Sequence, residues 1–204
     1  ESCRIAHLAA GTGGSATGII HSQFVVHTQV ETLTGRTAYG ISSCENVQQC
    51  DVRDIVSEND VAIGISGRRV QDCTVGNVRA NNANHGVGIW MNTFSMAVGN
   101  HVAGTKSHGI VVDTGGVATD NVVHAAGNTS SALAIGIAAG TKEGVRIEGN
   151  TAMGCGYGIQ ATAASAMVVR NNARLCDTNF VLTAAMPVVT SAALGTNPNA
   201  NVSQ

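Results

Sequence analysis

The chain has 204 residues, which is enough for one domain with a sizeable core or for two small ones. Hydrophobic residues make up 44% of it, but only 3% is aromatic and 12% charged, and the net charge of −2 provides no basic surface for nucleic acid. No apolar run approaches the ~20 residues that span a bilayer, so we predict no membrane insertion. No signal peptide opens the chain, which we interpret as a processed piece of a secreted or cell-surface protein of bacterial type.

A Gly-Ile pair recurs along the chain at intervals of 21 to 27 residues. The copies are Gly18-Ile19, Gly40-Ile41, Gly64-Ile65, Gly88-Ile89, Gly109-Ile110, Gly136-Ile137 and Gly158-Ile159, and we assign an eighth to Asn179-Phe180. We expect the Ile side chain to point inward and the Gly to allow a tight bend or a positive φ before a strand. Repeats of this length predict a solenoid.

A second signature lies between these pairs and reads apolar-x-x-(Asn/Cys/Thr)-x-apolar. Its copies are centred on Thr28, Cys50, Cys73, Asn100, Asn121, Asn150 and Asn171, and Cys3-Ile5-Leu8 is the tail of a truncated first copy. The apolar residues alternate over short stretches and are largely β-branched, which is typical of strands, and no copy holds an amphipathic helix. We therefore predict an all-β, right-handed parallel β-helix of about eight coils over residues 1–182. Residues 183–204, which hold both prolines, are predicted to form a capping tail.

The Gly-Ile pairs and segments such as "VRIEGNTA" at 145–152 and "ATDNVV" at 118–123 resemble right-handed β-helix repeat proteins of the pectate-lyase-like superfamily. The tail "LGTNPNANVS" at 194–203 is similar to the ending of secreted β-helix proteins of planctomycete and verrucomicrobial type. The resemblance covers roughly residues 3–182 and implies the fold. It implies little about activity, and where members of the superfamily bind substrate, they usually do so on the outward face of one strand stack.

The Gly-Ile strands allow that outward face to be predicted. If each Ile points inward, the next residue points out, and so does the residue two positions further on, which places Cys44 on the outside as well. Most of these positions carry small neutral residues. The distinctive candidates for ligand binding are Arg68, Trp90, Asn92 and Asp113, with His108 in a flanking position.

These candidates do not form a recognisable catalytic set. Glycosidases need two carboxylates across the scissile bond, and Asp113 is alone on this face. Lyases that resemble pectate lyase need several acidic Ca²⁺ ligands together with a basic residue, and Arg68 has no acidic cluster beside it. The seven histidines show no ligand spacing, so we expect neither a metal nor another cofactor.

Four of the six cysteines fall in equivalent positions of adjacent coils, as Cys50 with Cys73 and Cys155 with Cys176. Stacked Cα atoms about 4.8 Å apart are within the range of a disulfide. In an oxidising compartment both pairs could be bridged. Buried thiols that pack as small core residues are the alternative.

Three function classes remain open. The first, which we favour, is an extracellular non-catalytic β-helix, either structural or binding a polysaccharide or cell-surface partner. The second is a polysaccharide lyase or glycoside hydrolase of pectate-lyase-like type. The third is a trimeric shaft, as in fibres or tailspikes, whose threefold interface would bury Trp90 and Phe94. The sequence does not fix the oligomeric state.

Overall fold

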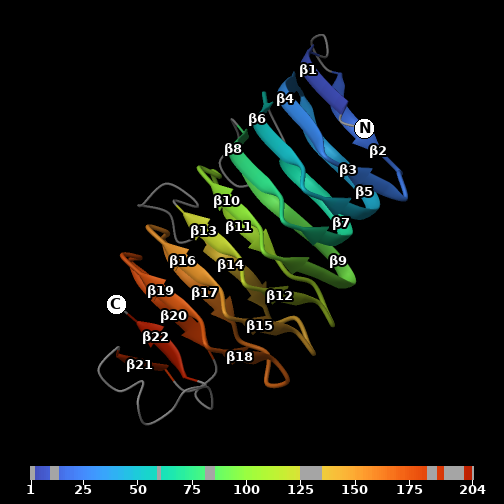
Figure 1. Cartoon of the computed structure of the whole chain (residues 1–204). Coiled ribbons are helices and arrows are strands. Elements are labelled where there is room, and N and C mark those ends of the chain that lie inside the picture. The colour runs from blue at the N-terminus through green and yellow to red at the C-terminus, as the bar shows by residue number, and fades with distance from the viewer. Residues whose placement is uncertain are drawn as a thin grey trace.

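A computed structural model describes residues 3–9, 14–58, 61–80, 86–124, 135–182, 188–190 and 200–203. All regular structure in this part of the chain is β-strand, and every strand pair is parallel. Successive coils of the chain lie as layers from one end of the molecule to the other (Figure 1). The predicted parallel β-solenoid is confirmed, with about seven turns.

Each coil contributes strands to three faces of the solenoid. Face 1 is a sheet of ten strands, in the spatial order β1 (Cys3–Ala9), β4 (Thr28–Gly35), β6 (Asp51–Ser57), β8 (Thr74–Ala80), β10 (His101–Ala103), β13 (Val122–His124), β16 (Thr151–Met153), β19 (Asn172–Arg174), β22 (Asn201–Ser203) and β21 (Val188–Thr190).

Faces 2 and 3 form one continuous sheet where long strands bend around their shared corner. These long strands are β5 (Thr37–Gln48), β7 (Ala62–Gln71) and β9 (Gly86–Val98). Face 2 also contains β2 (Ser15–Ile20), β11 (His108–Val111), β14 (Ile135–Gly140), β17 (Tyr157–Ala161) and β20 (Thr178–Leu182). Face 3 also contains β3 (Phe24–Val26), β12 (Val117–Thr119), β15 (Arg146–Glu148) and β18 (Met167–Val169).

The register between coils follows the repeat. Ile41, Ile65 and Ile89 are stacked partners on face 2, and the column continues to Ile159 and then Phe180. From Ile41 to Ile159 these isoleucines are fully buried, because like side chains pack on like in the interior. The predicted inward direction of the Gly-Ile isoleucines is thus confirmed, including the eighth copy.

The repeated glycines are required by close packing between coils. A Cβ on Gly109 would lie 2.5 Å from the carbonyl oxygen of Gly136, its counterpart in the next coil, and Gly40 stands in the same relation to Gly64. None of the repeated glycines has a positive φ. Of the two predicted alternatives, a tight bend or a positive φ, the positive φ is therefore excluded at these positions. Positive φ falls instead on the residue before the central Asn, Cys or Thr of each copy of the second signature, at His27, Gln49, Asp72, Gly99, Asp120, Gly149 and Arg170.

The predicted outward direction is wrong at Cys44. The register between β5 and β7 shifts after Ile41, so that Cys44 pairs with Gly67. Gly67 in turn pairs with Met91, and both Cys44 and Met91 are buried. One extra residue in β5 reverses the side of the sheet on which the following side chains lie.

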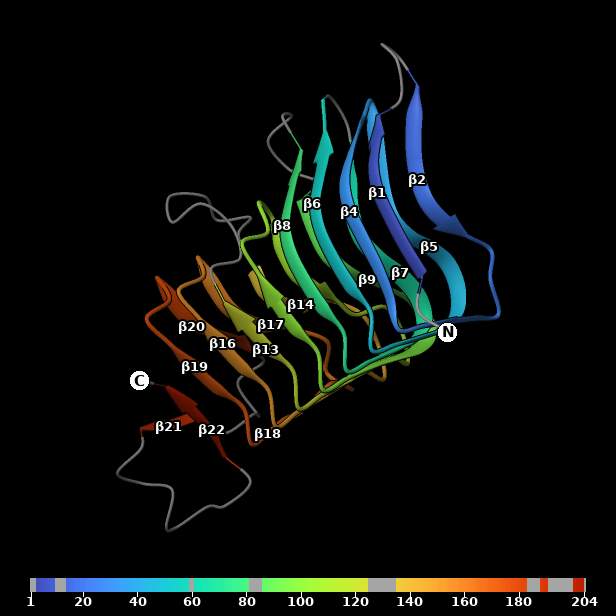
Figure 2. The same cartoon turned by 45° about the horizontal axis from the view of Figure 1, so that its top comes forward.

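The tail adds two strands to face 1 out of sequence order. β22 pairs with β19, and β21, which precedes β22 in the chain, lies outside it. Both strands lie at the end of the solenoid beside the C-terminus, opposite β1 and β2 (Figures 1 and 2). The tail therefore covers the edge of the last complete coil on this face, while the boundary at 182/183 stays a prediction.

Candidate functional site

A groove of about 430 Å³ lies on face 2. Two aromatic side chains, Trp90 and Tyr39, line it together with apolar residues and short polar ones. The full lining is Tyr39, Ser42, Ser43, Val61, Ile63, Ser66, Val87, Trp90 and Asn92. We call this hollow the aromatic groove.

The size difference between stacked outward residues produces the aromatic groove. Trp90 pairs with Ser66 in the preceding coil and with Val111 in the following one. The short serine side chain leaves space beside the indole, and 38% of the Trp90 surface remains exposed. Part of the indole is thus available to a ligand in the groove.

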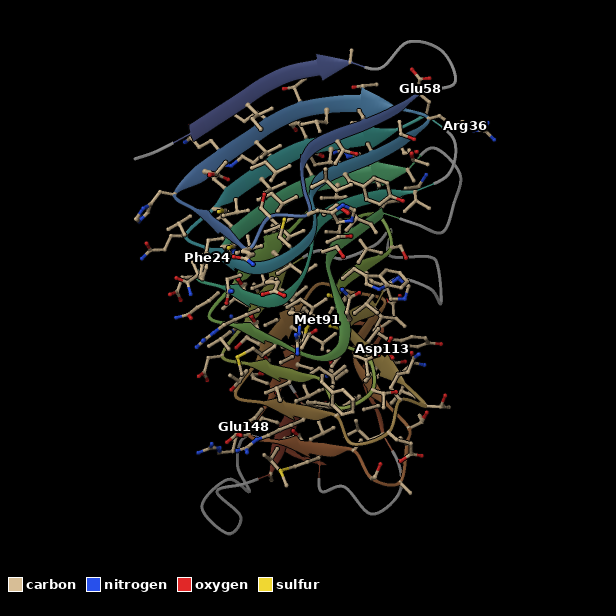
Figure 3. The ribbon with its side chains drawn as sticks, turned by 90° about the vertical axis from the view of Figure 1, so that its right-hand side faces the viewer. Phe24, Arg36, Glu58, Met91, Asp113 and Glu148 are labelled. Carbon is tan, nitrogen blue, oxygen red and sulfur yellow. The ribbon has the colours of Figure 1, made fainter. Side chains whose placement is uncertain are left out.

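A step in the corner between faces 2 and 3 bounds the groove. Gly67 pairs with Met91, but Arg69 pairs with Met96, so β9 holds three more residues at this corner than β7. The additional residues include Asn92 and Phe94, and the later coils keep the longer corner because Met96 pairs with Val117. We call residues 92–95 the ledge. Met91, directly before the ledge in the chain, is buried, and Asp113 lies in the following coil (Figure 3).

A second hollow of about 290 Å³ lies on the other side of the ledge. Its lining includes Arg68 and Arg69 from β7, Glu45 from β5 and Phe94 from the ledge, and the remaining residues are Asn46, Ser95, Met96, Gly115 and Val117. We call it the arginine cleft. Among the described residues, neither guanidinium has a hydrogen bond or an ion pair. With two cations and one carboxylate, the cleft is suited to an anionic group.

Phe94 is held in a conformation that bulky residues rarely adopt. Its φ is 55°, its side chain is 73% exposed, and its N–H donates to the carbonyl of Thr114 at 2.9 Å. A Cβ on Gly115 would collide with the phenyl ring, so the ring packs directly on that glycine.

Three of the five predicted candidates line these two hollows. Trp90 and Asn92 line the aromatic groove, whereas Arg68 lines the arginine cleft. His108 lines neither, although it pairs with the groove residue Val87 and contacts the side chain of Ser107.

Asp113 lies outside both hollows and is held in a turn. Its carboxylate bonds to Lys142 Nζ at 2.9 Å and accepts from the N–H of Thr114 at 2.7 Å. Both contacts lower the pKa of Asp113, and the contact with Lys142 has the larger effect. A carboxylate kept ionised is poorly suited to act as a general acid.

Acidic groups are sparse at the site. The aromatic groove has no carboxylate among its lining residues, and the arginine cleft has only Glu45. Within the described ranges, no three His, Cys, Asp or Glu side chains are grouped so as to hold a metal ion. The same ranges contain no helix long and apolar enough to cross a membrane.

The candidates for ligand binding do not include Tyr39, Arg69 or Phe94, and Phe94 is named only for a threefold interface. Strict alternation places Tyr39, two positions before the inward Ile41, on the inward side, whereas the structure leaves it half-buried in the lining of the groove, so the repeat pattern gives no signal for it. The ledge, by contrast, has a sequence signal. Gly64 and Cys73 are nine residues apart, whereas the equivalent Gly88 and Asn100 are twelve apart.

Both predicted cysteine pairs are stacked in adjacent coils. Asp51 pairs with Thr74, and this register places Cys50 beside Cys73 in the next coil. Met153 pairs with Arg174, and Cys155 and Cys176 each follow two residues later. All four are thiols in this structure. The disulfides stay a prediction.

Comparison with known proteins gives no relative for this chain: no family model matches it, and neither does any curated protein or solved structure. The parallel β-solenoid is shown by the strand register alone. The resemblance to the pectate-lyase-like superfamily, and the likeness to planctomycete and verrucomicrobial proteins, gain no support from these comparisons.

Proposed function

We propose that this protein is an extracellular, non-catalytic glycan-binding module. The observation that carries the proposal is the aromatic groove, in which Trp90 and Tyr39 stand beside serine hydroxyls and the Asn92 side chain. Sugar rings present apolar C–H faces that stack on aromatic rings, and hydroxyl groups that exchange hydrogen bonds with short polar side chains.

The arginine cleft favours a glycan that carries negative charge. The groove and the cleft share the ledge between them, so a chain of sugars that lies across the ledge would contact both. Arg68 and Arg69 would then bind a carboxylate or sulfate group on a neighbouring sugar, because guanidinium groups recognise such oxyanions.

Binding without catalysis is favoured by the same residues. The lining of the aromatic groove offers no acidic group to protonate a glycosidic oxygen, and the lone Glu45 of the cleft provides no carboxylate pair.

The test is a screen of neutral and acidic polysaccharides, followed by calorimetry on the ligands found. We expect Trp90→Ala to weaken binding by about tenfold or more, which corresponds to ~1.4 kcal/mol. Tyr157→Ala is the matched control, because Tyr157 shares the column of Tyr39 but lies three coils beyond Val87, outside the groove.

A double variant, Arg68→Ala with Arg69→Ala, tests the charge of the ligand. It should weaken acidic glycans selectively and leave neutral ones bound. Binding that survives Trp90→Ala, or the absence of any bound polysaccharide, would refute the proposal. The release of shortened or unsaturated sugars on incubation would show an enzyme instead, and a trimer whose interface covers Trp90 would favour a shaft.

A further inference from the structure

The two stacked cysteine pairs occupy different environments. Cys50 and Cys73 lie in the column that asparagines fill in the later coils. The Cys73 thiol donates toward the carbonyl of Val47 at 3.7 Å, as Asn100 Nδ2 donates to Val70 at 3.0 Å. These thiols therefore take the place of the asparagine side chains as hydrogen-bond donors.

Cys50 and Cys73 are also closed to solvent. Their exposed fractions are 2% and 1%. The hydrogen bond between the two thiols lowers the pKa of Cys50 to about 7 and raises that of Cys73. A dissolved reagent has no access to either sulfur without local unfolding.

Cys155 and Cys176 lie outside the asparagine column, and their exposure is unequal. Cys155 is 1% exposed, whereas Cys176 is partly exposed at the turn after β19. The N–H of Cys155 donates to Cys176 Sγ at 3.4 Å, so this sulfur lies directly against the neighbouring coil. The hydrogen bond from the Cys155 thiol lowers the pKa of Cys176 to about 7, which favours its thiolate.

We propose that Cys176 is a site of thiol–disulfide exchange with small disulfides and that Cys155 is its resolving thiol. This exchange at Cys176 does not depend on the proposed glycan binding. An accessible thiol beside a buried partner in the next coil is the arrangement that this two-step reaction requires. Parallel neighbours about 4.8 Å apart satisfy the Cα separation of a disulfide, about 4.4–6.8 Å.

The reaction needs only a dissolved disulfide as oxidant. The Cys176 thiolate attacks one sulfur of RSSR, an S–S bond forms between Cys176 and that sulfur, and one RS⁻ leaves. The Cys155 thiol then loses its proton and attacks Cys176 Sγ, which releases the second RS⁻. In sum, two protein thiols are oxidised to one disulfide and RSSR is reduced to two RSH, which retain both protons.

The bridge would join two adjacent coils next to the tail. It would link the turn after β16 to the turn after β19, the strand on which β22 is seated. Oxidation would thus fasten the last coil to the coil before it and leave the aromatic groove unchanged.

The test uses the reduced full-length protein and oxidised glutathione at neutral pH, with an acid quench and alkylation of the remaining thiols. Trypsin separates Cys155, in peptide 147–170, from Cys176, in peptide 175–204. We expect a linked pair of these two peptides, with Cys50 and Cys73 alkylated only after denaturation. Cys155→Ser should stop at a glutathione adduct on Cys176, and Cys176→Ser should form neither product.

The matched control is Cys73→Ser, which should leave the Cys155–Cys176 reaction unchanged. Because Cys155 is buried, Cys155→Ala serves as a second variant, with circular dichroism to show that each variant is folded. The proposal is overturned if the wild type stays fully reduced, if Cys50 and Cys73 bridge first, or if folded Cys155→Ser and Cys155→Ala carry no adduct on Cys176. The disulfide-linked peptides found in the wild-type digest decide the question even if no variant folds.

Discussion

Five asparagines form a continuous hydrogen-bonded ladder inside the solenoid. The side-chain Nδ2 of each donates to Oδ1 of the next at 2.9 to 3.0 Å. The ladder residues are Asn100, Asn121, Asn150, Asn171 and Asn201. Each of the first four has its own backbone N–H bonded to the same Oδ1, so the column satisfies buried backbone groups at the turn where the chain enters face 1.

Asn171 and Asn172 provide a matched pair for testing the ladder. Asn171 accepts from the Asn150 N–H at 2.9 Å and donates to the carbonyl of Ile147 at 2.9 Å, whereas Asn172 Oδ1 has no partner among the described residues. We expect Asn171→Ala to lower the free energy of unfolding by roughly 3–5 kcal/mol, because several buried polar groups lose their partners. Asn172→Ala should change it by less than about 0.5 kcal/mol. Chemical denaturation of both variants measures the difference, and equal effects would contradict a structural role for the ladder.

The strands of face 2 depend on backbone contact between glycines in adjacent coils. Gly109 is the central case, since a methyl group there would meet the Gly136 carbonyl and the side chain of Val123. Its neighbours cannot move aside without breaking the parallel ladder of the sheet. The strands of face 2 can therefore approach this closely at Gly109 because glycine has no side chain.

Gly109→Ala should lower the free energy of unfolding by about 2–4 kcal/mol, because the new methyl group overlaps backbone atoms. Gly76→Ala is the control, since a Cβ there would meet only Arg53 Cγ at 3.8 Å. That change should be neutral or stabilise by up to about 1 kcal/mol through the unfolded chain. Thermal unfolding distinguishes the two, and an unaffected Gly109→Ala protein would show that the coils can separate at this point.

At the level of the element, the repeat predicted the strands but not the corners between them. The ledge adds three residues to a coil of 21 to 27 residues. The spacing between successive Gly-Ile pairs does not show this addition by itself, because other loops of the coil also differ in length. The consequence is local and large, because it raises Phe94 above the preceding coils and separates Trp90 from Arg68. Periodicity predicts the outward side chains where the register is regular, which it is not at Cys44, and leaves open which hollow they share.

The whole molecule is nearly one-dimensional, since each coil contacts only its neighbours. Asn201 makes the end of the column, where its side chain accepts from Asn171 and donates to the carbonyl of Val168 at 2.7 Å. The repeat pattern predicts that residues 183–204 form a capping tail. Within this tail, Asn201 adds one further member to the asparagine column, 30 residues after Asn171.

Asn201→Ala should therefore loosen one end of the solenoid and leave the rest intact. We expect amide hydrogen exchange to become faster in β19 and β22, with β4, β6 and β8 unchanged, because stability in a repeat array is propagated between neighbours. Asn121→Ala, in the middle of the column, should accelerate exchange on both sides of its coil. Uniformly faster exchange in the Asn201→Ala protein would indicate a single cooperative unit.

The amino-acid sequence by itself determined the fold class, the inward columns and the stacking of the cysteines, because a parallel solenoid converts a repeat of residues into a repeat of contacts. The tertiary structure alone decided which outward residues share a hollow, where a register shift turns Cys44 inward, and how β22 enters between β19 and β21. Those features depend on differences between adjacent coils, whereas a repeat pattern records what the coils have in common.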